Sequence, residues 1–153
     1  EPYRRQRQMC IRDSCKSHLI PDENRIYINL NEMHGENDIY FILAHEIRHC
    51  AQYQATEGIG LADIAMPETI YEWKREFSRY NPGCNDESCQ EVELDAMAFT
   101  WFIGKVLLNE DVNLSCDEVL VEPYKRYIIR NYSLTEIKER LDYSGLEFGR
   151  NQA

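Results

Sequence analysis

The chain has 153 residues and a net charge of −10, with 43% hydrophobic and 11% aromatic residues. This composition is typical of a folded globule with a moderate core, and it excludes a disordered tail. The acidity argues against nucleic acid as a direct partner, because binding to phosphates requires clustered basic residues. The chain also lacks the run of about eighteen apolar residues that a membrane-spanning helix needs.

Residues 4–14 differ from the rest of the chain. They carry four arginines and one aspartate, a net charge of +3, so that the remainder carries −13. The segment reads like the translation of a sequencing adapter, and we expect residues 1–14 to be a non-native extension. The alternative is a natural basic arm that binds nucleic acid. We expect residues 15–153 to form a single domain whose native N-terminus is missing.

The first predicted elements are a strand and a long helix. Arg25–Leu30 alternates apolar and polar residues, which predicts a strand. The run from Asp38 to Gln54 predicts an amphipathic helix, with Asn37 or Asp38 as its cap. Its apolar residues recur at spacings of three and four; they are Ile39, Ile42, Leu43, Ile47, Cys50 and Ala51.

This helix contains the most informative motif of the chain, His45-Glu46-Ile47-Arg48-His49. Positions i and i+4 share one face of a helix, so both imidazoles can reach one metal ion. Two nitrogens at this spacing suit Zn²⁺, and Glu46 can take a proton from a metal-bound water. The alternative is a surface helix whose two histidines are ordinary polar residues.

Further helices are predicted downstream. Thr56–Gly60 should end the first helix, and Pro67 should start a second one with an aromatic stripe that belongs to the core. A third helix is predicted from Glu91 to about Leu108, and a fourth should start or kink at Pro123. A capping box at 133–136 predicts a last short helix. No glycine-rich phosphate loop and no serine nucleophile elbow occurs.

The cysteines do not form a paired framework. Without Cys10 their number is odd, and Cys84 and Cys89 bracket a short loop. This pair could hold free thiols or a local disulfide, or could form half of a metal site. Cys50 lies on the apolar stripe and is expected to be a buried small hydrophobe. The reducing cytoplasm is the default compartment for such a chain.

The helix that starts at Glu91 offers acids for a metal site. Glu91 and Asp95 are again i and i+4, and a zinc ion with two histidines needs a third protein ligand. We therefore predict Glu91 as the third ligand. We predict that Asp95 accepts the free N–H of a ligating histidine. Glu93 lies on the other side of this helix and is interpreted as a solvated acid.

The two segments 44–51 and 90–102 together resemble the gluzincin zinc peptidases. The pattern Glu-x-Glu-x-Asp-Ala-x-Ala-Phe is closest to the ImmA/IrrE-type and the membrane-associated CAAX-protease and heat-shock-protease groups, although hydrophobic spans are missing here. The resemblance implies an α+β, mainly α, zincin-like domain with a short N-terminal sheet and a metal-binding helix pair. It also implies His45, His49 and Glu91 as zinc ligands, with Glu46 as the acid/base and Asp95 as the residue that orients a histidine.

The expected function is hydrolysis of a peptide or protein substrate by a zinc-activated water, with Glu46 as the general base. The alternative is a zinc-stabilised regulatory or binding module without turnover, which would have no need of Glu46. Catalysis would also need a donor for the oxyanion. The candidates for this donor are Tyr53, Tyr80, Tyr124, Tyr127 and His34.

Overall fold

The structure is a computed structural model that describes residues 16–20, 23, 25–59, 64–81, 89–133, 135–137 and 139. It confirms the predicted class, mainly α-helix with a small antiparallel sheet. The predicted extension 1–14, together with Cys84 and the end of the last predicted helix, lies outside the described residues. The elements in chain order are β1 (His18–Ile20), β2 (Arg25–Tyr27), η2 (Leu30–Glu32), α2 (Asp38–Thr56), α3 (Pro67–Phe77), α4 (Glu91–Ile103), η3 (Gly104–Leu108) and α5 (Glu118–Asn131).

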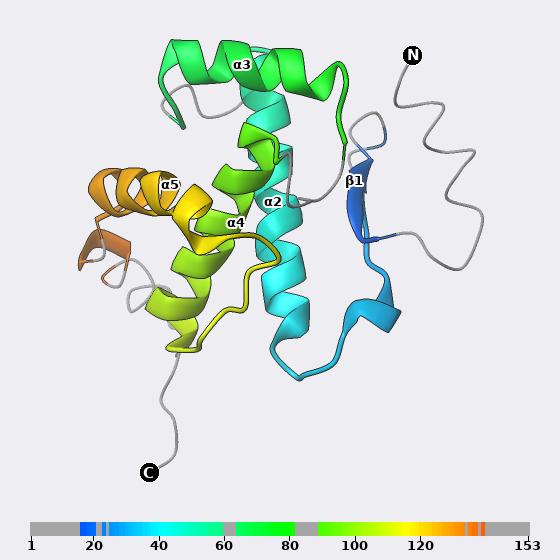
Figure 1. Ribbon diagram of the computed structural model, residues 1–153, viewed down its shortest axis with the longest axis vertical. Helices are drawn as coiled ribbons and strands as arrows, with labels where there is room; N and C mark the ends of the chain where they lie inside the picture. Colours follow the sequence, from blue (N-terminus) through cyan, green and yellow to red (C-terminus); the bar gives the residue numbers. More distant parts are fainter. Residues whose placement is uncertain are drawn as a thin grey trace.

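The helices α2 and α4 form the centre of the fold. They lie side by side and run in opposite directions, with α5 on the other side of α4 and the strands beside α2 (Figure 1). The helix α3 crosses one end of this pair. The strands β1 and β2 are antiparallel, with Leu19 opposite Ile26. The predicted strand at Arg25 is thus present, but it ends at Tyr27 and pairs with a strand that the sequence did not reveal.

The helix α2 begins and ends close to the predicted positions. Asn37 is the N-cap residue but makes no capping hydrogen bond with its side chain. The Asp38 carboxylate instead accepts the backbone N–H groups of His34 and Gly35, at 2.6 and 2.8 Å, and so fixes the loop that enters the helix. At the other end Gly58 has a φ of +68°, a backbone conformation that glycine adopts without steric cost.

The side of α2 that faces the protein interior is unusually polar. Its buried residues are Ala44, Glu46, Arg48, His49, Gln52 and Thr56, whereas Ile47 of the predicted apolar stripe is 51% exposed. Arg48 and Gln52 are thus interior residues of this helix. Buried polar groups require partners, and the partners come from α4.

The helix α4 is buried on nearly all sides. It packs through Leu94, Met97 and Phe102 against α5, where Val121 and Ile128 complete one hydrophobic cluster. A helix that is apolar around most of its circumference belongs in the core of a protein. Any acid on such a helix must therefore find a partner, unless it lies at the first turn.

The start of α4 is held by α3. The Glu76 carboxylate accepts the backbone N–H groups of Glu91 and Val92, at 3.0 and 2.9 Å, and so satisfies two donors that a helix N-terminus leaves open. Trp73 and Phe77 of α3 pack with Val92 in a second hydrophobic cluster, which confirms the expected core role of the aromatic stripe. These contacts set the position of α4 relative to α2.

The remaining predictions about local structure have mixed outcomes. The helix α5 begins at Glu118, where the Asp117 side chain accepts the N–H of Val119, so Pro123 lies inside this helix and does not start it. Cys89 is disulfide-bonded, whereas Cys84, its partner in the predicted local disulfide, lies outside the described residues. Cys50 is only partly buried.

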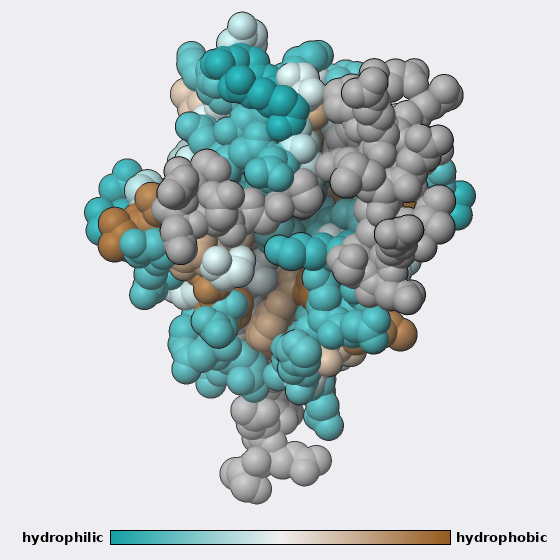
Figure 2. Space-filling model, turned by 45° about the vertical axis from the view of Figure 1, so that its right-hand side comes forward, coloured by the Kyte–Doolittle hydropathy of each residue, from teal (hydrophilic) through white to brown (hydrophobic). Residues whose placement is uncertain are grey.

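The surface shown in Figure 2 is mostly hydrophilic. Hydrophobic residues appear there as a narrow strip near the middle of the face and as small patches at its edges. In the part of the chain that the structure describes, no helix combines the length and the apolar character needed to cross a membrane.

Candidate metal centre

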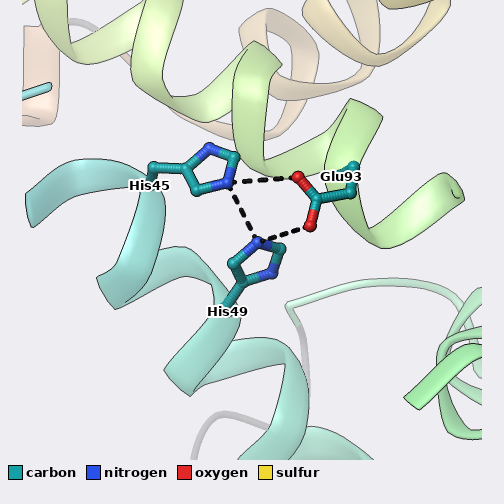
Figure 3. A group of neighbouring side chains, drawn as sticks. All are labelled: His45, His49 and Glu93. Atoms are coloured by element: carbon teal, nitrogen blue, oxygen red, sulfur yellow. Dashed lines mark hydrogen bonds and ion pairs between the residues drawn. The ribbon is translucent and has the colours of Figure 1, made fainter. Parts of the chain in front are cut away.

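Three side chains from the two central helices converge on one point. His45 and His49 are one turn apart on α2, and their Nε2 atoms lie 3.0 Å from each other. Glu93 of α4 faces both rings, with Oε2 3.3 Å from His45 Nε2 and Oε1 3.4 Å from His49 Nε2 (Figure 3). The predicted pairing of the two histidines is thus present in the structure.

The arrangement fits a tetrahedral metal ion. Zinc binds imidazole nitrogen and carboxylate oxygen at about 2.0–2.1 Å, and two ligand atoms of a tetrahedron with such bonds lie about 3.3–3.4 Å apart. The two Nε2 atoms lie 3.0 Å apart, and Glu93 faces them with different oxygens, Oε2 at 3.3 Å from His45 and Oε1 at 3.4 Å from His49. One ligand atom from each of the three residues lies within 4.8 Å of the other two, so the side chains are close enough to share one ion. Two nitrogens and a carboxylate also form the donor set of many catalytic zinc sites.

The charges of the three groups are matched to a cation. Burial raises the pKa of the Glu93 carboxyl, but hydrogen bonds from His45 and His49 outweigh it and place this pKa far below its usual range. Burial lowers the pKa of His49, and the hydrogen bond to Glu93 reverses this, so that the net pKa is raised. The pocket therefore favours a positive charge between the rings and the carboxylate.

The site has one open side. His49 and Glu93 are 3% and 2% exposed, whereas the His45 side chain is 22% exposed. Of these three residues, His45 is therefore the one that solvent or a ligand can reach. Metal sites that act on substrates keep such an access, whereas purely structural sites are closed by a fourth protein ligand.

Glu46 lies next to the three ligand candidates and is 5% exposed. Burial raises the pKa of its carboxyl, the two histidines lower it, and Glu93 raises it, with a net upward shift. A carboxylate with a raised pKa accepts a proton more readily at neutral pH. Glu46 is thus a buried carboxyl with a raised pKa, close enough to the three ligand candidates for their charges to act on it.

The structure does not bring the predicted ligand Glu91 to the two histidines. Glu91 is the first residue of α4, is exposed, and binds Glu76 through its backbone N–H. The carboxylate that meets the histidines is that of Glu93, one half-turn further along the helix. A sequence signal existed: Glu93 stands between Val92 and Leu94 in a helix that is apolar almost all around, where an acid has to be paired.

The prediction for Asp95 is also corrected. Asp95 does not contact a histidine; its Oδ2 accepts the Gln52 amide at 2.7 Å and Arg48 Nε at 2.6 Å. The histidine partner is Gln52, whose Oε1 lies 2.8 Å from His49 Nδ1. An amide oxygen can only accept, so Nδ1 is the donor to Gln52. In the neutral imidazole the lone pair is then on Nε2, the nitrogen that faces Glu93 and that a metal would bind.

The amide nitrogen of the Gln52 side chain makes two further hydrogen bonds. Its Nε2 donates to the Val92 carbonyl at 3.0 Å as well as to Asp95, and the residue is fully buried. Asp95 thus acts on His49 through Gln52, one residue further away than expected. The sequence reasoning passed over Gln52, although its position three residues after His49 places both on the same side of the helix.

Tyr80, one of the five oxyanion candidates, lies at the site. Its hydroxyl donates to Glu93 Oε1 in a short hydrogen bond and lies 3.3 Å from His49 Nε2. Tyr53 packs edge-on against Phe77, with ring centroids 5.7 Å apart, and Tyr127 is on α5. The tertiary structure thereby places the Tyr80 hydroxyl at the site.

Comparisons of the chain with protein-family models, with curated proteins and with solved structures find no match.

Proposed function

We propose that this protein is a zinc-dependent peptidase of the gluzincin type. His45, His49 and Glu93 would hold the metal, and Glu46 would serve as general acid and base. The observation that carries the proposal is the convergence of the two Nε2 atoms with the Glu93 carboxylate at separations of 3.0–3.4 Å. The resemblance of the two helical motifs to gluzincins supports the same reading.

The metal would lower the pKa of a bound water to about 7 and polarise the scissile carbonyl. The chain's own residues account for the remaining requirements. Glu46 is in place to accept a proton from the nucleophile and to return it to the leaving amine. Gln52 holds His49 in the tautomer that presents Nε2, and the burial of Glu93 keeps bulk water away from this part of the site.

The sheet beside α2 offers a place for an extended substrate. Within the described residues it has two strands in the order β1-β2, so each strand has an outer edge. A peptide can add to such an edge by backbone hydrogen bonds. We infer that an extended substrate adds to an edge of this sheet, which lies against the metal-binding helix α2 through β1.

The test compares the full chain with Glu46→Gln, which preserves the shape of the side chain but removes the base. Zinc content would be measured in both proteins after dialysis, followed by cleavage of an unfolded protein substrate. We expect one zinc per chain in both and cleavage by the wild type alone. Because removal of a general base typically costs 10²–10⁴-fold in rate, a variant that retains wild-type activity would contradict the assignment.

The same experiment addresses the regulatory alternative. One zinc in each protein, without cleavage of any unfolded substrate by either, would favour a zinc-stabilised binding module. The absence of zinc from both would contradict the metal centre itself. A suitable control is Glu57→Gln, which changes an exposed glutamate just beyond the end of α2.

A further inference from the structure

Tyr80 touches two of the three ligand candidates. Its hydroxyl donates to Glu93 Oε1 and lies 3.3 Å from His49 Nε2, while the other carboxylate oxygen, Oε2, faces His45 at 3.3 Å. A tyrosine hydroxyl has a single proton to donate. The two oxygens of Glu93 are therefore in different surroundings. Oε1 accepts the Tyr80 hydroxyl and lies 3.4 Å from His49 Nε2, whereas Oε2 faces His45, the more exposed of the two histidines.

The position of Tyr80 is fixed by its neighbours. Its ring packs on those of Phe77 and His49, with centroid distances of 5.8 and 5.7 Å. The next residue, Asn81, donates its backbone N–H to the Gln90 side chain at 2.7 Å, directly before α4. The segment that carries Tyr80 is thus tied to the helix that carries Glu93, which keeps the hydroxyl and the carboxylate together.

We propose that Tyr80 is a positioning residue that restricts Glu93 to ligation through Oε2. A carboxylate can bind a metal through one oxygen or through both, and the second mode occupies an additional coordination position. With Oε1 held by Tyr80, Glu93 supplies one ligand atom. The position that remains is available to water or to a substrate carbonyl. This proposal rests on the proposed function of the site.

The experiment uses Tyr80→Phe in the full chain, with cobalt(II) in place of zinc. The visible absorption of cobalt(II) is intense in four-coordinate sites and several-fold weaker in five-coordinate ones. We expect the wild type to show the intense spectrum and Tyr80→Phe the weaker one, because Glu93 Oε1 becomes free to bind. We also expect a loss of metal affinity of roughly tenfold, the lower end of the range for removing a hydrogen-bond partner of a metal ligand.

The matched control is Tyr71→Phe, which removes the same hydroxyl from the exposed face of α3 and should leave spectrum and affinity unchanged. An unchanged spectrum in Tyr80→Phe would overturn the proposal. So would a phenolate-to-metal charge-transfer band in the copper(II)-loaded wild type that Tyr80→Phe lacks, because Tyr80 would then be a ligand itself.

The outcomes also separate this proposal from the proposed function. If the wild type binds cobalt(II), Tyr80→Phe changes the spectrum and neither cleaves peptides, the positioning role stands and the peptidase assignment fails. If both bind the metal with the same spectrum and the wild type cleaves peptides, the peptidase assignment stands and the role of Tyr80 fails. A wild type that binds no metal would overturn both.

Discussion

Arg48 of α2 and Asp95 of α4 form a bidentate ion pair in the interior of the protein. Arg48 Nε lies 2.6 Å from Oδ2 and Nη2 lies 3.1 Å from Oδ1, and the two side chains are 2% and 3% exposed. Arg48 Nη1 also donates to the Tyr132 hydroxyl at 3.0 Å. The pair joins the helix that carries both histidines to the helix that carries Glu93, and so helps to set their separation.

Removal of Asp95 should therefore destabilise the fold strongly. Asp95→Ala leaves the Arg48 guanidinium buried without its counter-ion, and we expect a loss of about 3–5 kcal/mol in the free energy of unfolding, measured by urea denaturation. The exposed pair of Glu72 and Arg75 provides the control; Glu72→Ala should cost less than about 1 kcal/mol. The double variant Arg48→Met/Asp95→Ala should lose less free energy of unfolding than Asp95→Ala alone, because it leaves no unpaired charge in the interior. If Asp95→Ala and Glu72→Ala reduce the free energy of unfolding equally, the buried ion pair does not stabilise the fold as expected.

Gln52 should matter for metal binding more than for catalysis as such. Gln52→Leu removes the acceptor that holds the proton on His49 Nδ1, and we expect zinc affinity to fall by roughly 10–100-fold. Competition with a chromophoric chelator would measure the affinity. Gln54→Leu, on the same helix but hydrogen-bonded to Cys50 at 3.7 Å, is the control and should retain wild-type affinity. If both variants bind zinc equally well, Gln52 has no role in orienting His49.

The identity of the carboxylate ligand can be tested with two adjacent acids. Zinc that binds only the folded state stabilises it, by about 2.7 kcal/mol at a hundred times the dissociation constant. We expect the wild type and Glu91→Gln to gain thermal stability on addition of zinc, and Glu93→Gln to gain little. Thermal unfolding with and without zinc measures the difference. The reverse pattern would restore Glu91 as the ligand.

The carboxylate of Asp38 predicts how the stability of the fold depends on pH. Hydrogen bonds from the backbone of His34, and then of Gly35, lower the pKa of its carboxyl below the value for an unfolded chain. A lowered pKa in the folded state contributes stability above the unfolded pKa of about 3.9, and this contribution is lost as the pH falls through the folded value. Asp38→Asn should therefore be less stable than the wild type at pH 7, and the difference should shrink below about pH 4. Urea denaturation across this range would show it, and a difference independent of pH would contradict the assignment.

The sequence by itself determined the positions of α2, α3 and α4 and the pairing of the two histidines on one face of α2. A period of 3.6 residues defines α2, and the spacing of His45 and His49 brings both rings to one face, because both properties depend only on positions within one helix. The starts of α3 and α4 at Pro67 and Glu91 were predictable for the same reason.

The choice between Glu91 and Glu93 depended on the tertiary structure. The sequence fixes the angle between two residues around a helix axis, but not which side of the helix faces a neighbour. That rotation is set by the packing of Val92 against α3 and by the binding of the α4 N-terminus to Glu76. Because α4 is buried on nearly all sides, Glu93 is also in the interior, although it lies on the opposite side of the helix from Asp95.

The partners of the buried polar groups were likewise decided by contacts between helices. Asp95 meets Arg48 and Gln52 across 47 and 43 residues of sequence, and Tyr80 meets Glu93 from the segment that follows α3. No local pattern encodes such distances, because they arise when the hydrophobic faces of α3, α4 and α5 are buried together. The sequence therefore supplied the chemistry of the candidate site, and packing selected which side chains complete it.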